Sequence, residues 1–168
     1  MRIGRLVSSL AVALGLTAFG TPAAMAGPCA AAPYRAFDFW IGDWQIRGAD
    51  GKLTGTNKVQ PEYDGCVIRE QYAGASGYSG GSVNIYDASR NVWHQTWTDA
   101  VGTLLTLEGG VKDGKMVLEG QGKGPDNKPM KHRVTWAPQA DGGLTQLWEA
   151  TDLKGQWQTV FDVKYSKK

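Results

Sequence analysis

From Gly42 to the C-terminus, hydrophobic and polar residues alternate with a period of two over many short runs. These runs are rich in Val, Thr, Trp and Tyr, and clusters of Gly, Pro, Asn and Asp separate them, which is typical of strands joined by turns. The pattern predicts about ten strands, at 43–48, 53–62, 66–73, 81–87, 92–98, 103–110, 115–121, 130–137, 144–151 and 157–165.

Four Asp-Gly pairs lie between these runs, and Asp-Gly readily adopts the positive backbone angles of a tight hairpin. They are Asp50-Gly51, Asp64-Gly65, Asp113-Gly114 and Asp141-Gly142. Adjacent strands are therefore expected to be antiparallel. Closing the sheet removes the edges that would otherwise promote aggregation. The prediction is one all-β domain over residues 27–168, an up-and-down barrel, with a two-sheet sandwich as the alternative.

One short helical turn is expected before the first strand. Pro33 suits the first turn of a helix, and Phe37, Trp40 and Ile41 follow at helical spacing.

Residues 1–26 resemble a signal peptide. Arg2 and Arg5 precede an apolar stretch, and the segment ends in the small-residue sequence Ala24-Met25-Ala26. Polar and turn-forming residues interrupt the apolar stretch too early for a membrane span. The sequence therefore predicts export to the periplasm or medium, with no transmembrane segment after cleavage. A lipid anchor on Cys29 is the minor alternative.

The two cysteines, Cys29 and Cys66, would both reach an oxidising compartment after export. Two thiols in such a compartment usually pair, so we expect a disulfide between the N-terminus and an early strand. Two unrelated thiols remain the alternative.

The charge balance disfavours a polyanionic partner. The chain has 18 Lys and Arg against 16 Asp and Glu, and Arg2 and Arg5 lie in the segment predicted to be removed. A neutral mature domain without a basic run is not expected to bind nucleic acid or an anionic membrane.

In the last strand, the row Trp157, Thr159, Phe161, Val163 and Tyr165 is expected to face the interior. Other interior rows combine aromatic and polar residues, and in 81–87 the row with Ser82 competes with Val83 and Ile85. The candidate ligand-binding residues from these rows are Glu70, Tyr72, Asn84, Tyr86, Gln95, Trp97, His132, Trp136, Gln146 and Trp148.

An unpaired polar group in the interior costs about 1–3 kcal/mol, so the Gln and Glu side chains must bond one another, hold water or face a ligand. Aromatic walls with a few polar groups favour a small-molecule cavity. Seven tryptophans could equally fill a solid barrel.

The segment from Phe37 to Trp44 places a Gly-x-Trp at the entry to the first strand, as in the calycin superfamily. The stretches 64–70, 84–87 and 93–99 resemble a bacterial calycin-like family of unknown function. This resemblance implies a lipocalin-like barrel that binds an apolar ligand. Nitrobindin-type relatives suggest haem, but their late histidine has no counterpart in 144–151 or 157–165, so no cofactor is expected.

The leading hypothesis is an exported barrel that binds a small, partly apolar molecule. An isomerase or lyase with Glu70 and His132 as acid and base is the first alternative. An envelope interaction module with a packed core is the second. Two histidines and a cysteine pair do not supply a metal site, and His94 is expected to face outward. The glycine-rich segment 74–81 lacks the lysine and helix of a phosphate loop and is expected to lie near a barrel mouth.

Overall fold

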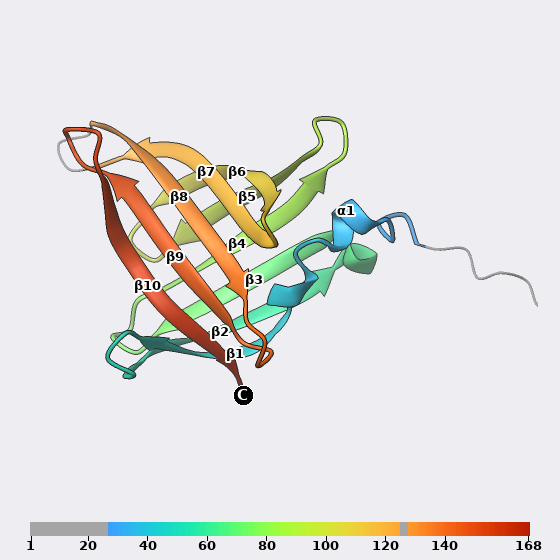
Figure 1. Cartoon of the computed structure of the whole chain (residues 1–168), viewed down its shortest axis with the longest axis horizontal. Helices are drawn as coiled ribbons and strands as arrows, with labels where there is room; N and C mark the ends of the chain where they lie inside the picture. Colours follow the sequence, from blue (N-terminus) through green and yellow to red (C-terminus); the bar gives the residue numbers. More distant parts are fainter. Residues whose placement is uncertain (1–26, 125–127) are drawn as a thin grey trace, which may run out of the picture.

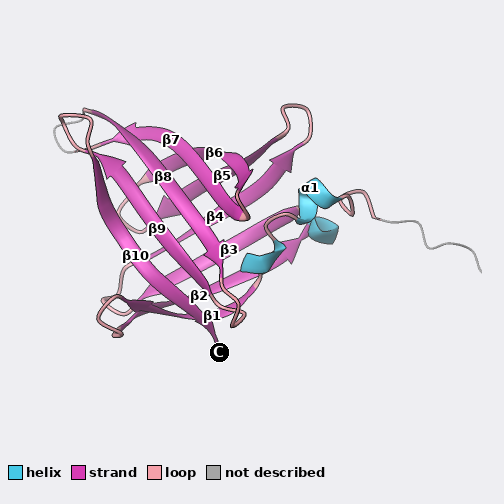
Figure 2. Cartoon of the chain, viewed as in Figure 1, coloured by secondary structure: helices cyan, strands magenta, loops and turns pink. Residues whose placement is uncertain are grey.

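The computed structural model describes residues 27–124 and 128–168, so the predicted signal peptide lies outside the described residues. Strands make up most of the described chain (Figure 2). They are β1 (Gly42–Gly48), β2 (Leu53–Glu62), β3 (Val67–Gly74), β4 (Ser79–Asp87), β5 (Val92–Asp99), β6 (Leu104–Lys112), β7 (Lys115–Lys123), β8 (Pro129–Pro138), β9 (Leu144–Thr151) and β10 (Trp157–Lys167).

These ten strands form a closed antiparallel barrel in which sequence neighbours are also neighbours in the sheet. The barrel closes where β1 pairs with β10, from Trp44 opposite Lys167 to Gly48 opposite Val163. The predicted up-and-down barrel is confirmed, and the sandwich alternative is wrong.

The Asp-Gly turns behave as predicted. Gly51, Gly114 and Gly142 have φ angles of 77°, 75° and 80°, which glycine adopts without the steric cost of a side chain. The Asp64-Gly65 pair lies in a short 3₁₀ turn, η2 (Tyr63–Gly65), that joins β2 to β3.

The up-and-down order gives the barrel two different ends. Connections β2–β3, β4–β5, β6–β7 and β8–β9 lie at one end, and the remaining hairpins lie at the other. Two short helices, α1 (Ala32–Arg35) and η1 (Asp38–Trp40), cover the first end, at the right of Figure 1. We call this the helix end and the opposite one the open end.

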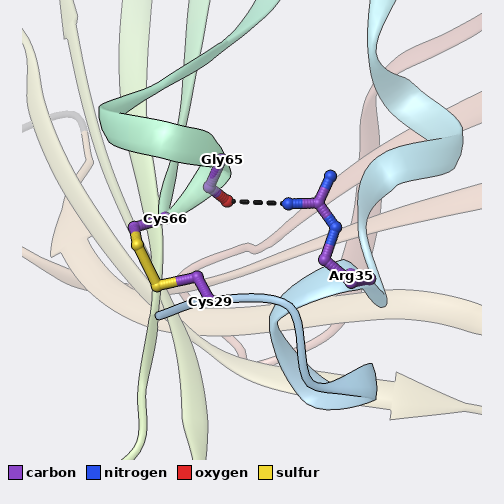
Figure 3. The surroundings of a disulfide bond; sticks show 4 residues. All are labelled: Cys29, Arg35, Gly65 and Cys66. Carbon is purple, nitrogen blue, oxygen red and sulfur yellow. Dashed lines mark hydrogen bonds between the residues drawn. A yellow bond between two sulfur atoms is a disulfide. The ribbon is translucent and has the colours of Figure 1, made fainter. Parts of the chain in front are cut away.

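A disulfide joins the N-terminal segment to the barrel at the helix end. Cys29 and Cys66 are bonded with their Cα atoms 5.1 Å apart, as the sequence predicted (Figure 3). Arg35 adds a 3.1 Å hydrogen bond from its guanidinium to the carbonyl oxygen of Gly65. The covalent bond and the hydrogen bond together hold α1 against the β2–β3 connection.

The N-terminal segment that contains the two helices brings aromatic side chains into the barrel. Phe37 stacks on Trp40 with ring centroids 4.8 Å apart, and its edge contacts Trp136 at 5.1 Å. The indole nitrogen of Trp44 donates a 2.8 Å hydrogen bond to the carbonyl oxygen of Trp40. At the helix end, the barrel interior is therefore filled by side chains of the protein.

The prediction that the row beginning at Trp157 faces the interior is wrong for the first two residues of that row, Trp157 and Thr159. A β-bulge lies between Thr159 and Phe161, where the pairing with β9 shifts register. An extra residue reverses the direction of every side chain before it. Thr159 is consequently exposed, and Trp157 lies outside the barrel under the guanidinium of Arg133, 4.3 Å from its ring centroid. Phe161, Val163 and Tyr165 face inward as predicted.

No helix in the described ranges combines the length and apolar character that a membrane crossing requires.

Candidate functional site

A cavity of about 330 Å³ occupies the barrel toward the open end. It extends from Ser76, which is exposed in the β3–β4 hairpin, to Glu70, whose side chain is buried. Its lining comprises Glu70, Tyr72, Ser76, Tyr78, Gln95, Trp97, Leu105, Leu107, Val134, Trp136, Gln146, Trp148, Phe161 and Tyr165. The interior is thus solid at the helix end and hollow toward the open end, so the two alternatives left by the sequence each describe part of the barrel.

Aromatic side chains form most of the cavity wall. Tyr72 lies opposite Trp97 and Phe161, with ring centroids 6.4 Å and 6.5 Å away. Trp148 is half-buried on the neighbouring strand β9. Trp136 belongs both to this wall and to the aromatic core at the helix end. The cavity therefore offers a broad apolar surface to a ligand.

Glu70 places a carboxylate at the buried end of the cavity. Its two oxygens accept hydrogen bonds from Asn57 Nδ2 at 2.7 Å and from Ser82 Oγ at 2.6 Å. Burial raises the pKa of Glu70 from its ordinary value of 4.5 to about 7, and the hydrogen bonds from Ser82 and Asn57 oppose this rise. The Glu70 carboxyl group is therefore expected to change between its protonated and ionised forms near neutral pH.

Strand register explains the hydrogen bond between Ser82 and Glu70. Glu70 on β3 lies directly opposite Ser82 on β4, with both side chains on the interior face. This pairing settles the ambiguity in β4, because Ser82 and Asn84 are buried inside while Ile85 is exposed.

The polar side chains continue on both sides of Glu70. Asn84 Nδ2 donates to Ser82 Oγ at 2.9 Å, and Gln95 Nε2 donates to Asn84 Oδ1 at 2.7 Å. On the other side, the Tyr165 hydroxyl donates to Gln146 Oε1. It also accepts a 3.4 Å hydrogen bond from Asn57 Nδ2. A hydrogen-bonded belt across six strands thus supports the carboxylate.

Asp99 organises the side of the cavity nearer the open end. Its Oδ2 accepts hydrogen bonds from the Tyr78 hydroxyl at 2.7 Å and from Trp97 Nε1 at 3.3 Å. Desolvation acts to raise the pKa of Asp99, but hydrogen bonds from Tyr78, Thr103 and the Val101 amide outweigh it and hold the pKa well below its ordinary value. Asp99 is therefore ionised at neutral pH and orients two wall residues.

Seven of the ten residues predicted from the sequence line the cavity: Glu70, Tyr72, Gln95, Trp97, Trp136, Gln146 and Trp148. Asn84 is buried in the belt without lining the cavity. Tyr86 packs its ring edge-on against Tyr34 of α1, at a centroid distance of 5.0 Å.

His132, the tenth residue, does not line the cavity. Its Nδ1 accepts a 3.2 Å hydrogen bond from Trp148 Nε1, and burial lowers the pKa of its ring. Within the described residues, the side-chain hydrogen bonds of Glu70 go to Asn57 and Ser82, not to His132. The predicted acid–base pair is not hydrogen-bonded in this structure. His94 faces outward as expected and bonds Glu108 and Thr96.

The candidate list omitted half of the lining: Ser76, Tyr78, Leu105, Leu107, Val134, Phe161 and Tyr165. The alternation predicted that Phe161 and Tyr165 face inward. Their row on β10 contains no Gln, Glu or Asn, the residue types that marked other rows as ligand-facing. Tyr78 lies in the glycine-rich segment 74–81. The only sequence evidence for its role was the expectation that this segment lies near a barrel mouth.

In the part of the chain that the structure describes, no three His, Cys, Asp or Glu side chains converge as metal ligands would. The sequence matches no protein-family model, and no curated protein is significantly similar to it.

Proposed function

We propose that this chain is an exported, calycin-like barrel that binds a small, partly apolar molecule in the cavity. The observation that carries the proposal is the cavity of about 330 Å³, which combines aromatic walls with a buried carboxyl group. Ligand sites commonly have volumes of roughly 300–1,000 Å³, apolar walls and few polar groups that orient the ligand.

Export is supported by the signal-like sequence of residues 1–26 and by the Cys29–Cys66 disulfide. Disulfides persist in oxidising compartments such as the periplasm and the extracellular medium. The calycin-like resemblance is supported by the closed barrel and by the buried position of Trp44, the tryptophan of the Gly-x-Trp sequence.

Binding fits the contacts better than the two alternatives. The enzyme hypothesis relied on Glu70 and His132 acting together, and these residues have separate hydrogen-bond partners. The interaction-module hypothesis assumed a packed core, and a large exposed aromatic patch on the outer strand faces would favour it. Tyr63 is the one aromatic residue among the large, exposed hydrophobic side chains of the described ranges.

Intrinsic tryptophan fluorescence tests the proposal, because Trp97, Trp136 and Trp148 line the cavity. We expect a saturable change on titration with at least one class among fatty acids, neutral aromatics, quinones and aromatic amines. Calorimetry should give the same affinity. A lack of binding by all four classes at millimolar concentration would contradict the proposal.

A matched pair of variants locates the binding site. Val134→Phe adds volume inside the cavity, whereas Val160→Phe makes the same change at a β10 side chain that is 52% exposed. We expect the first variant to lose ligand binding and the second to retain it, with both showing the circular dichroism of the wild type. Equal affinities in the two variants would place the ligand elsewhere.

A further inference from the structure

The charged groups of the cavity have one sign. Among the residues that line it, Glu70 is the single acid, and there is no Lys, Arg or His. Asp99, which accepts from the lining residues Tyr78 and Trp97, adds a second carboxylate nearby. No residue in the described ranges forms a salt bridge with either acid.

The groups around Glu70 are neutral. Asn57 on β2, Ser82 on β4, Gln95 on β5 and Gln146 on β9 carry amide or hydroxyl groups. On β3 and β10, burial raises the pKa of Tyr72 and Tyr165, which keeps both phenols uncharged at neutral pH. The protein therefore supplies hydrogen bonds to the carboxylate but no counter-charge, although a buried charge without a counter-ion is costly.

An unsatisfied acceptor lies beside the carboxylate. Asn57 Oδ1 is buried behind the cavity lining and has no hydrogen-bond partner within the described structure, while the amide nitrogen of the same side chain donates to Glu70. One buried donor in the lining, Trp136 Nε1, also has no partner there. The carboxylate therefore has an unsatisfied acceptor beside it and no cationic donor, and the one unpartnered donor of the lining, Trp136 Nε1, is neutral.

The walls complement a positive charge as well. Seven aromatic side chains line the cavity: Tyr72, Tyr78, Trp97, Trp136, Trp148, Phe161 and Tyr165. The faces of aromatic rings attract cations, and organic ammonium groups are recognised by several such rings together. A carboxylate ligand would instead face Glu70, with no basic residue in the lining to pair with.

We propose that the cavity selects a small organic cation, a primary amine whose ammonium group contacts the Glu70 carboxylate and whose apolar body packs between the aromatic walls. This inference rests on the proposed binding function and specifies the class of its ligand. An apolar cavity of about 150 Å³ accommodates a benzene molecule. The volume of about 330 Å³ therefore holds one ring with a short alkylamine arm.

Three probes of similar shape and different charge test the inference by calorimetry: 2-phenylethylamine, 2-phenylethanol and 3-phenylpropionate. At pH 8 we expect the amine to bind about tenfold more tightly than the alcohol, which corresponds to about 1.4 kcal/mol for one charge-assisted contact. We expect the carboxylate to bind most weakly.

The Glu70→Gln variant keeps the side-chain length and removes the charge. We expect the amine's advantage over the alcohol to fall below about threefold in this variant, while the affinity for the alcohol changes little. Glu119→Gln is the matched control, because Glu119 is exposed and pairs with Arg133 outside the barrel. It should retain the wild-type preference.

The wild-type protein provides a second measurement that needs no variant. Raising the pH from 6 to 8 ionises Glu70, whose pKa is about 7. The affinity for the amine should then rise by roughly tenfold, while that for the alcohol should stay constant.

Several outcomes would overturn the inference. If the alcohol binds as tightly as the amine, or the carboxylate binds most tightly, the cation preference is wrong and the cavity remains a ligand site. If none of the three probes binds but another class in the fluorescence panel does, the cation preference is wrong in the same way. If no class binds, the proposed function fails as well.

Discussion

The hydroxyl of Ser82 donates a 2.6 Å hydrogen bond to the carboxylate of Glu70 inside the barrel. The two residues face each other on adjacent strands, and both are buried. This pair places an ionisable group where the aromatic core ends and the cavity begins.

Glu70 should make the stability of the protein depend on pH. Its pKa is about 7 in the folded chain against an ordinary value of 4.5, so the folded state binds this proton more tightly than the unfolded state. The resulting stabilisation is complete below about pH 4.5 and is lost as the pH rises through 7. It amounts to about 3 kcal/mol.

Urea unfolding of the wild type and Glu70→Gln between pH 4.5 and 8 measures this effect. The free energy of unfolding of the wild type should fall relative to the variant as the pH rises. His132 has the opposite effect, because its lowered pKa makes the folded protein less stable at acidic pH. This contribution is the same in both proteins, so it cancels in the difference between their free energies of unfolding. A difference that is independent of pH would contradict the prediction.

The disulfide should contribute strongly to stability. Cys29 and Cys66 are 37 residues apart, and closing a loop of that length contributes about 4 kcal/mol in the chain-entropy model. A Cys29→Ala/Cys66→Ala double variant should unfold at a correspondingly lower urea concentration. A reducing agent should lower the stability of the wild type and leave that of the double variant unchanged. Equal unfolding midpoints for wild type and double variant would contradict the prediction.

Two tryptophans with opposite orientations should respond differently to truncation. Trp136 is buried between Phe37 and Trp40, so Trp136→Ala should cost about 3–5 kcal/mol. Trp157 lies outside the barrel under the guanidinium of Arg133, so Trp157→Ala should cost about 1 kcal/mol or less. Thermal and urea unfolding of both variants test this difference. Comparable losses would mean that Trp157 is a core residue after all.

Adjacent glycines on β6 provide another matched comparison. A Cβ atom added at Gly109 would lie 2.1 Å from the carbonyl oxygen of Val117, whereas one added at Gly110 would meet nothing within 4 Å. Gly109→Ala should therefore cost more than about 2 kcal/mol, because strand backbone would have to move. Gly110→Ala should change stability by less than about 0.5 kcal/mol. Urea unfolding distinguishes the two, and tolerance of Gly109→Ala would contradict the close approach of β6 and β7.

The prediction from sequence succeeded where the signal was local. Alternation and Asp-Gly turns located the strands, and antiparallel hairpins in series led to the closed barrel. The polar residues Glu70, Gln95 and Gln146 were recognised as interior because their rows also contain aromatic side chains. The same reasoning failed at Trp157, because a single inserted residue near Thr159 reverses the facing of the strand without changing its composition.

The sequence by itself determined which elements form, their order and most of the side chains that face inward, because the two-residue period of a strand is written in neighbouring positions. Tertiary structure decided how deep each inward side chain lies. Phe37 and Trp40 fill the barrel at one end, so Trp136 meets the core on one side and the cavity on the other. Whether an inward residue lines a void or packs solidly depends on side chains from distant strands and from the N-terminal helices, and the alternation along one strand contains no information about them.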